Sequence, residues 1–291
     1  GVQTCALPIL TGEDVQLWEA SFGYNQNTHI IGVNQPLGQM YGYVTDGLYQ
    51  VSDFDYDEAT KTYTLKDGVP YSGKKTDVKP GMWKFKNVDG SEDNKITEND
   101  KTVIGNAYPK FYGGINNTFT YKDFDLSIFL TYSFGNDVFN ATKLTNTKTA
   151  LQNKNVLDIA NSSNRWVVVN KKGELITDPQ EMADINKGKT VAAVYDNEIG
   201  DTYIHSWAVE DGSYLKLSNI TLGYTFPRKM LSKIGISKLR LYATGSNLLT
   251  WTKYTGFDPE VSTMGSGLTP GVDFGAYPKS RSFVFGINLA F

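Results

Sequence analysis

One acidic turn, residues 89–100, has the spacing of a metal-binding loop. Counted from Asp89, its oxygen ligands fall at positions 1, 3, 5, 7, 9 and 12, which are Asp89, Ser91, Asp93, Lys95 (through its main-chain carbonyl), Thr97 and Asp100. A hard cation such as Ca²⁺ takes about six to eight oxygens from such a turn. The spacing therefore predicts a calcium loop, in which Asn94 replaces the usual left-handed glycine. The alternative is a solvated acidic turn without an ion.

Two details leave the register of this loop open. The twelfth position is Asp rather than Glu, and Asp can supply one oxygen where Glu supplies two. Counting from Gly90 instead of Asp89 leaves two extra residues. Calcium is the only cofactor that the sequence indicates.

Aromatic side chains in the long connecting segments are the second group of candidate binding residues. Amphipathic rings can stack on sugar faces, and the alternatives for each ring are packing within its own segment or anchoring at a membrane interface. The candidates are Tyr71, Trp83, Trp166 and Trp207. His29 and His205 have no partners at ligand spacing, so we expect both to be structural or exposed and not metal ligands. No nucleotide-binding, zinc-protease or serine-hydrolase motif occurs, so we predict no catalytic residue and no enzyme activity.

Composition excludes several classes of protein. The 291 residues carry 28 basic and 31 acidic side chains, a balance that gives no basic face for nucleic acid. The mean hydropathy is −0.35 and no run of 18 apolar residues occurs, which excludes a membrane-spanning helix. Strands that alternate in polarity are compatible with these values. Residues 1–9 read like a translated sequencing adapter and contain the single cysteine, Cys5, so we set them apart from residues 10–291.

The clearest strand is the last stretch of the sequence, residues 281–291. Apolar side chains alternate with small or polar ones, so that one face carries Phe283, Phe285, Ile287, Leu289 and Phe291. A tilted strand needs about 9–11 residues to cross the hydrocarbon core of a bilayer. The length and the alternation are those of a transmembrane β-strand, and equally of a half-buried strand in a soluble sandwich.

Further strands are expected at 14–26, 110–121, 124–134, 213–226 and 238–251. Lys122 and Asp123 make a tight hairpin turn, and a change of parity near Ser218 and Asn219 predicts a β-bulge. Residues 227–237 are expected to form a turn, and 178–186 a short helix. The segments 27–109, 136–212 and 252–280 show no sustained period and are interpreted as long loops.

The order of these elements gives about six antiparallel strands whose connections alternate between long and short. Aromatic residues gather at the short-turn end, namely Tyr121, Phe124, Tyr224, Phe226 and Phe291. Short turns on one side, long loops on the other and a girdle of aromatics are typical of an outer-membrane β-barrel. We therefore predict an all-β, antiparallel transmembrane barrel. Its polar inner face would include Asn116, Thr118, Asp125 and Ser127.

Several segments in the same order resemble the C-terminal barrel portion of SusC/RagA-type TonB-dependent outer-membrane transporters. They are residues 39–49, 109–119, 124–129, 211–227, 247–251, Gly-Phe-Asp-Pro-Glu at 256–260 and Tyr-Pro-Lys-Ser-Arg at 277–281. The resemblance runs from about Trp18 to Phe291. The family's plug and its TonB-contacting segment have no counterpart in this sequence.

The resemblance implies import of oligosaccharides or peptides across the outer membrane of a Gram-negative bacterium. It implies a SusD-type surface lipoprotein as partner, energy through the TonB complex, contact with outer-membrane lipid, and recognition of the terminal strand (Phe283 to Phe291) by the barrel-assembly machinery. Two other readings stay open at this point. One is a secreted glycan-binding β-domain with a calcium-stabilised loop. The other is a β-rich glycosidase, although no two carboxylates pair in the sequence.

Overall fold

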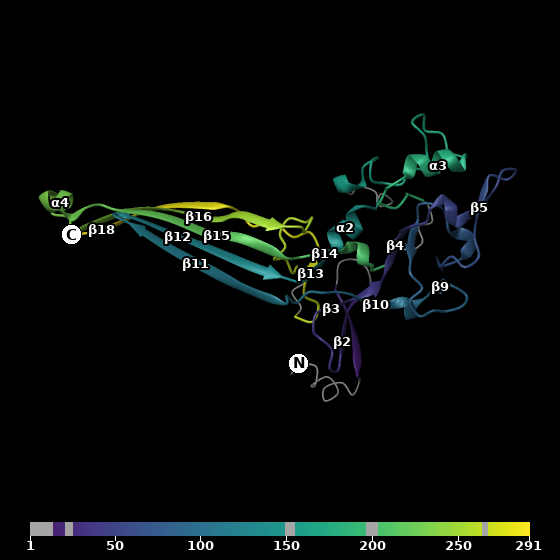
Figure 1. The fold of residues 1–291 in the computed structure, drawn as a ribbon, viewed down its shortest axis with the longest axis horizontal. Helices are drawn as coiled ribbons and strands as arrows, with labels where there is room; N and C mark the ends of the chain where they lie inside the picture. The colour runs from purple at the N-terminus through teal and green to yellow at the C-terminus, as the bar shows by residue number, and fades with distance from the viewer. Residues whose placement is uncertain (1–13, 21–25, 149–154, 196–202, 264–266) are drawn as a thin grey trace. The chain divides into compact units, whose positions relative to one another are not determined.

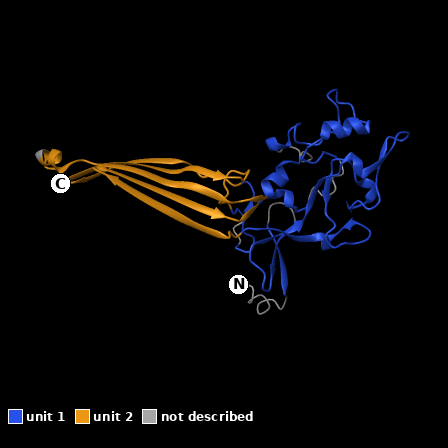
Figure 2. Ribbon diagram, in the orientation of Figure 1, with its two compact units in different colours: residues 1–107, 139–209, 262–275 blue, residues 108–138, 210–261, 276–291 orange. Residues whose placement is uncertain are grey.

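The computed structural model describes residues 14–20, 26–148, 155–195, 203–263 and 267–291. The chain divides into two compact units, which are shown in different colours in Figure 2. Unit 1 comprises residues 1–107, 139–209 and 262–275, and unit 2 comprises residues 108–138, 210–261 and 276–291. The adapter-like residues 1–9, and Phe22 and Tyr24 of the first expected strand, lie outside the described residues.

Unit 2 is built on a five-stranded antiparallel sheet (Figure 1). Its strands, in spatial order, are β11 (Phe111–Tyr121), β12 (Phe124–Phe134), β15 (Tyr214–Thr225), β16 (Lys238–Thr252) and β18 (Ser282–Ala290). This confirms the strands expected at 110–121, 124–134, 213–226, 238–251 and 281–291, and the tight turn at Lys122, which has a positive φ of 53°. The first expected strand is not part of this sheet.

The register places most apolar side chains of the sheet on one face, because directly opposed residues point the same way; Phe129 and Val284 lie on the other face. One row across the sheet runs Phe119, Leu126, Leu222, Ala243 and Phe285. The neighbouring row on the other face runs Thr118, Ser127, Thr221, Thr244 and Val284. The sheet therefore has an apolar face and a mostly polar face. Asn116, Thr118, Asp125 and Ser127 lie on the polar face, as expected.

A β-bulge keeps this alternation in phase. Phe129 opposes Asn219 while the next residue, Leu130, opposes Leu217, so Ser218 is the extra residue. The bulge confirms the parity change seen in the sequence. Without it, Leu217 and Leu222 could not both lie on the apolar face, because a one-residue shift exchanges the two faces of a strand.

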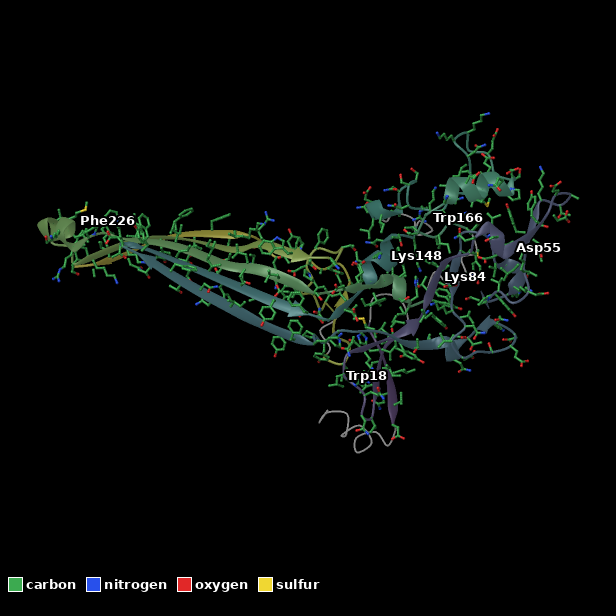
Figure 3. The ribbon with its side chains drawn as sticks, viewed as in Figure 1. Trp18, Asp55, Lys84, Lys148, Trp166 and Phe226 are labelled. Atoms are coloured by element: carbon green, nitrogen blue, oxygen red, sulfur yellow. The ribbon has the colours of Figure 1, made fainter. Side chains whose placement is uncertain are left out.

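Aromatic rings bound the apolar face at both ends. At the short-turn end, Phe124, Tyr224 and Phe226 pack in sequence, with ring centroids 4.7 Å and 4.9 Å apart; the first pair is tilted and the second edge-on, and Phe226 is labelled in Figure 3. At the other end, Phe111 and Phe134 pack with centroids 5.4 Å apart. The ten residue steps from Phe124 to Phe134 span about 33 Å along the strand, or about 25 Å at a tilt of about 40°, the height of an outer-membrane apolar band. Of these two groups, only the one at the short-turn end was expected from the sequence.

The connection from β15 to β16 is more ordered than the turn expected at 227–237. It contains a short helix, α4 (Arg228–Leu231), followed by a 3₁₀ turn, Ser232–Ile234, and Gly235 then takes a left-handed conformation. Pro227 precedes the helix, in keeping with its fixed φ and missing N–H. The connection nevertheless remains short.

Unit 1 contains most of the residues of the three segments that were expected to be long loops, 27–109, 136–212 and 252–280. Its largest sheet has the order β1 (Val15–Glu19), β2 (Asn27–Gly32), β3 (Gln39–Tyr43) and β10 (Lys101–Asn106). Three two-stranded sheets pair β4 (Thr45–Leu48) with β8 (Trp83–Phe85), β5 (Phe54–Asp57) with β6 (Thr62–Leu65), and β7 (Tyr71–Ser72) with β9 (Lys95–Ile96). The strand expected at 14–26 is thus shorter where it is described, and it pairs within unit 1. The remaining short strands are β13 (Asp137–Asn140), β14 (Val209–Asp211) and β17 (Val272–Asp273).

In the described residues of unit 1 there are two α-helices, α2 (Ala141–Asn146) and α3 (Pro179–Asn186). Helix α3 confirms the helix expected at 178–186, and its start follows from sequence. Asp178 caps it by accepting a hydrogen bond from the Glu181 amide, and Pro179 occupies the first turn. Three apolar clusters form the interior of unit 1, centred on Phe85, Phe139 and Phe54.

Among the residues that the structure describes, no helix has the length and apolar character needed to cross a membrane.

Candidate functional site

The expected calcium loop is held by its own hydrogen bonds. The Asp89 and Asp93 carboxylates each accept from the amide two residues ahead, Ser91 at 2.8 Å and Lys95 at 3.0 Å. Asn94 has a positive φ of 55°, which confirms the left-handed residue expected at the sixth position. Asn87, just before the loop, donates to the Ser91 carbonyl at 2.8 Å and was not singled out from the sequence.

Asp100, at the twelfth position, closes the loop through main-chain amides. Its fully buried carboxylate accepts from the amides of Thr97 at 2.7 Å, Val88 at 2.8 Å and Asp89 at 3.3 Å. These three amides give the buried carboxylate hydrogen-bond partners without a cation. In the described part of the chain, no three His, Cys, Asp or Glu side chains gather closely enough to hold a metal ion. Calcium binding by Asp89, Asp93 and their neighbours stays a prediction.

The four candidate aromatics have unequal exposure. Trp166 is 2% exposed and its ring packs against Gly81, so it is a core residue; Figure 3 labels it within unit 1. This corrects the expectation that Trp166 could stack on a ligand, because its faces are covered by protein. Tyr71 is half-buried and packs against the apolar cluster around Phe54.

Trp83 and Trp207 lie together, with ring centroids 4.8 Å apart. They line a cavity of about 310 Å³, together with Leu48, Thr45, Ser206 and Lys189. A cavity of this size with an aromatic wall and a few polar groups falls within the range of small-ligand sites. Trp83 is buried, with 5% of its surface exposed, whereas Trp207 is half-buried. This cavity is the candidate binding site of unit 1.

Hydrogen bonds fix the wall of this cavity. The Thr45 amide donates to Ser206 Oγ at 3.0 Å, and the Trp207 amide donates to Thr45 Oγ1 at 3.3 Å. On the indole of Trp207, the Lys143 ammonium lies 4.2 Å from the ring centroid, within cation–π range. The same ammonium donates to the Trp207 carbonyl at 3.0 Å. Trp207 is therefore held in place from two sides.

Both histidines are structural, as expected. His205 is fully buried beside Trp83 and its Nδ1 lies 2.8 Å from Thr45 Oγ1. Burial, helped by the charges of Lys148 and Lys143, lowers the pKa of His205 to about 3. His29 bonds Thr28 Oγ1 and the Pro270 carbonyl through its two ring nitrogens. Burial lowers the pKa of His29 to about 4, although the Pro270 bond works in the opposite direction.

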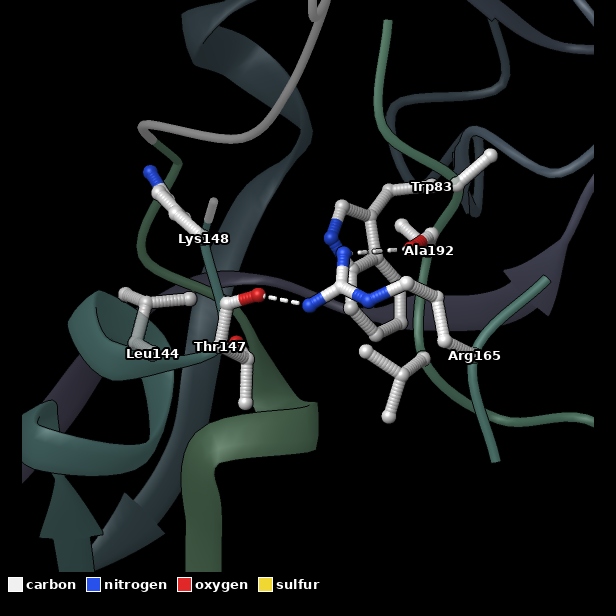
Figure 4. A pocket seen from close by; sticks show the side chains of 8 residues that line it. Trp83, Leu144, Thr147, Lys148, Arg165 and Ala192 are labelled. Atoms are coloured by element: carbon white, nitrogen blue, oxygen red, sulfur yellow. Dashed lines mark hydrogen bonds between the residues drawn. The ribbon is translucent and has the colours of Figure 1, made fainter. Parts of the chain in front are cut away.

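A second hollow, shown in Figure 4, is closed by Arg165. The guanidinium donates to the carbonyls of Thr147 and Ala192, the latter at 3.2 Å, and Nε donates to Ala160 at 3.3 Å. The free space left is about 10 Å³, less than a ligand needs. Arg165 thus joins three segments of unit 1. No spacing rule in the sequence indicates this role, because its acceptors are main-chain carbonyls.

The polar face of the unit 2 sheet carries Asp125, one of the residues expected on the inner face of the barrel, in an ion pair. Arg240 on β16 donates to Asp125 on β12 at 3.0 Å and 2.5 Å, across Gly223 of the strand between them. A side chain at Gly223 would collide with this pair, since its Cβ would lie 2.4 Å from the guanidinium. The face therefore combines fixed ion pairs with hydroxyl and amide side chains, a surface suited to water and polar solutes and not to an apolar core.

Comparison with known proteins agrees with these features. No family model matches the chain. The chain is 32% identical over 286 residues to the TonB-dependent receptor P3 of Formosa agariphila, a match that covers 96% of this chain and 25% of that receptor. It is 27% identical over 209 residues to the TonB-dependent receptor SusC of Bacteroides thetaiotaomicron, covering 70% of this chain and 17% of SusC.

Solved structures share the fold. A structure of the RagAB peptide transporter matches with a TM-score of 0.58 and 20% identity, over 97% of this chain and 25% of that one. The RagAB peptide importer in its open-open state matches with a TM-score of 0.60 and 18% identity, over the same shares. The likeness covers both units. The chain thus belongs to the TonB-dependent receptors of the SusC/RagA type, and it spans about a quarter of the length of receptor P3 and of the matched RagAB chain.

Proposed function

We propose that this chain forms part of the wall of an outer-membrane transporter that imports oligosaccharides or peptides, with energy supplied through TonB. The observation that carries the proposal is the unit 2 sheet, whose exposed apolar face is bounded at both ends by aromatic rings. An apolar band of this height, opposite a polar face, fits a strand array between lipid and a water-filled lumen. The chain has no catalytic role in this proposal.

The proposal assigns sides of the membrane to the connections. The short turns at Lys122 and at 227–237 would lie in the periplasm, and unit 1 would lie outside the cell, where a SusD-type surface lipoprotein could cover it. Support comes from the difference in connection length and from the SusC likeness. The cavity at Trp207 would then face incoming ligand, and its indole and its Lys189 rim suit a sugar or a peptide side chain.

Cysteine labelling of the full-length parent receptor tests this arrangement. Lys229→Cys and Glu92→Cys, both at exposed positions, are placed singly in a cysteine-free background and treated in whole cells with a membrane-impermeant maleimide. We expect labelling at 92 in whole cells, and at 229 only after the outer membrane is opened. Labelling of residue 229 in intact cells would reverse the proposed sides.

Uptake tests the transport function and the ligand class. Cells expressing the parent receptor are given a fluorescent oligosaccharide or a fluorescent peptide, with and without TonB. We expect TonB-dependent accumulation of one of the two, and a reduced rate for Trp207→Ala. Tyr71→Ala is the matched aromatic control, because Tyr71 does not line the cavity. Accumulation that is independent of TonB would contradict the proposal.

A further inference from the structure

Three groups converge on one carboxylate in unit 2, that of Glu260. Lys216 Nζ and Lys279 Nζ each lie 2.6 Å from Glu260 Oε2, and the Tyr214 hydroxyl donates to Oε1 at 2.8 Å. Tyr214 and Lys216 belong to β15, whereas Lys279 precedes β18 by three residues. The cluster therefore unites the segments 211–227, 256–260 and 277–281, which were separate motifs in the sequence.

The backbone around Glu260 is built to present this carboxylate. Asp258, itself buried, accepts the Glu260 amide at 2.9 Å, which fixes a tight turn around Pro259. Upstream, the Thr252 hydroxyl accepts from the Tyr254 amide at 3.1 Å and donates to the Ser213 carbonyl at 2.8 Å. The start of the connection is thus also tied to the beginning of β15.

The charges of the cluster depend on one another. Lys216 lies on the polar face of the sheet, yet its side chain is only 5% exposed, so its ammonium needs an anion nearby. Burial alone would raise the pKa of Glu260, but the hydrogen bonds from Lys216, Lys279 and Tyr214 prevail and lower it to about 2. The carboxylate therefore stays charged throughout the physiological range.

The cluster provides a contact between β15 and the segment before β18 that strand pairing does not provide. Strands β15 and β18 are not neighbours, because β16 lies between them. In the described sheet β18 is held only by β16. Its alternation of apolar and small residues excludes a slip of one residue, which would exchange its faces, but a slip of two residues keeps every side chain on the correct face. A contact to a third strand removes that ambiguity.

We propose that Glu260 is a latch that sets the register of β18. It fixes Lys279 relative to β15, and thereby fixes where the chain enters the sheet at Ser282. With Lys279 held, the native pairs such as Thr244 with Val284 form, and pairs shifted by two residues do not. Gly286 supports the same register, since a Cβ there would collide with the ring of Tyr242.

Disulfide trapping in the full-length parent receptor tests the latch. In a cysteine-free background, Thr244→Cys is combined either with Val284→Cys, its native partner, or with Ser282→Cys, a partner only after a two-residue slip. We expect the native pair alone to cross-link in the otherwise unchanged receptor. With Glu260→Gln added, the native cross-link should fall several-fold and the shifted one should appear. Glu58→Gln, at an exposed position in unit 1, is the matched control for loss of one carboxylate.

The test remains decisive if Glu260→Gln prevents assembly, because that variant leaves the Lys216 ammonium buried without its anion. The double variant Glu260→Gln with Lys216→Met removes both charges and should assemble, with Lys279 still released. Faster trypsin cleavage after Lys279, by about tenfold, should accompany the shifted cross-link. Native cross-linking at full yield in either variant would overturn the proposal. So would failure of both variants to assemble, if Lys279→Met, which keeps the Lys216 pair, assembles with native cross-links.

Discussion

The two units bury their apolar residues in opposite ways. In unit 1 the large rings point inward: Phe85, Trp166 and Phe139 are almost fully buried in two internal clusters. In unit 2 they point outward, and Phe285 and Phe283 on β18 are 80% and 66% exposed. Unit 1 therefore has the organisation of a protein in water. The apolar face of unit 2 exposes large apolar side chains on all five strands, for example Phe119, Phe124, Leu222, Leu241 and Phe285, and it fits an apolar surrounding such as lipid.

Strand length follows the same division. The sheet strands of unit 2 contain 9 to 15 residues, whereas the longest strands of unit 1 contain six. A long strand whose two faces lie in different environments needs apolar and polar side chains in strict alternation. The type of each residue therefore indicates the face on which it lies. Short strands around an internal cluster need only one or two inward side chains each. This difference predicts how each unit responds to acid, to charge and to added volume.

Lowering the pH should produce the largest difference in stability between the two units. Both buried histidines lie in unit 1, and their pKa values are lowered to about 3 and about 4, so below pH 6.5 the unfolded chain binds protons that the folded chain does not. Each histidine then lowers the free energy of unfolding of unit 1 by about 1.4 kcal/mol per pH unit, which amounts to about 3 kcal/mol at pH 4. The folded-state pKa of Glu260 in unit 2 is lowered to about 2, so its contribution is lost only as the pH falls from about 4.5 towards 2.

Tryptophan fluorescence of a Trp251→Phe variant of the parent receptor between pH 7 and pH 4 follows the tryptophans of unit 1, because the substitution removes the tryptophan of the unit 2 sheet, and heat-modifiable gel mobility measures the barrel. We expect unit 1 to melt at lower temperature with falling pH while the barrel stays assembled. His205→Gln should flatten the pH dependence. An unchanged melting temperature of unit 1 between pH 7 and pH 4 would contradict the role of the histidines.

A charge on the outer face of the sheet should be the next largest effect. Leu130 lies on the apolar face of β12 between Ile115 and Leu217, and Leu130→Arg should cost about 2–4 kcal/mol near the middle of a bilayer. Thr131 is its neighbour on the polar face, where its hydroxyl lies 2.6 Å from Ser218 Oγ, and Thr131→Arg should cost much less. Urea titration of the receptor folded into lipid vesicles gives both values. Equal losses would show that the two faces do not differ in surroundings.

The same contrast explains how much could be predicted from the sequence. Alternation over eleven residues predicts β11 and β12, and a change of parity predicts the bulge at Ser218, because each residue of a two-faced strand carries information. Helix α3 was predictable from its cap, Asp178, and from the Pro179 that follows. These are local rules, and the structure confirms them.

Most of unit 1 could not be predicted by such rules. Strands as short as β7 and β9, with two residues each, carry no period, and their parallel pairing joins residues 24 positions apart, Tyr71 with Lys95. The burial of Trp166 depends on Gly81, and the Glu260 cluster depends on Lys216, both distant in sequence. An isolated Trp or Glu in a loop gives no local signal of its distant partner.

Added volume in unit 1 should have a smaller effect than charge on the sheet. Gly81 has a positive φ of 86°, and a Cβ at this position would lie 2.4 Å from the ring of Trp166. Gly81→Ala should therefore destabilise unit 1 by about 2–3 kcal/mol, through both strain and overpacking. Gly68 has a similar φ of 79° with nothing within 4 Å of its Cβ, so Gly68→Ala should cost only about 1 kcal/mol. The difference between the two thermal midpoints measures the packing against Trp166, and equal midpoints would contradict it.

Calcium should have the smallest effect, and its test concerns the acidic turn of unit 1. The twelfth residue is Asp100, whose carboxylate already accepts three main-chain amides, so any calcium bound by Asp89 and Asp93 would have few strong ligands. Weak loops of this type bind with a Kd of about 1 mM. At 10 mM calcium such a site adds about 1.4 kcal/mol of stability by mass action.

The thermal midpoint of unit 1 should therefore rise with calcium and not with equal magnesium, since magnesium demands a tighter octahedral set of ligands. Asp93→Asn removes one anionic ligand but keeps an oxygen that can accept from the Lys95 amide, so this variant should lose the calcium response and keep its midpoint without the ion. If the thermal midpoint of the unchanged receptor does not depend on calcium, the calcium prediction is wrong. The turn is then a hydrogen-bonded loop that Asp100 closes without an ion.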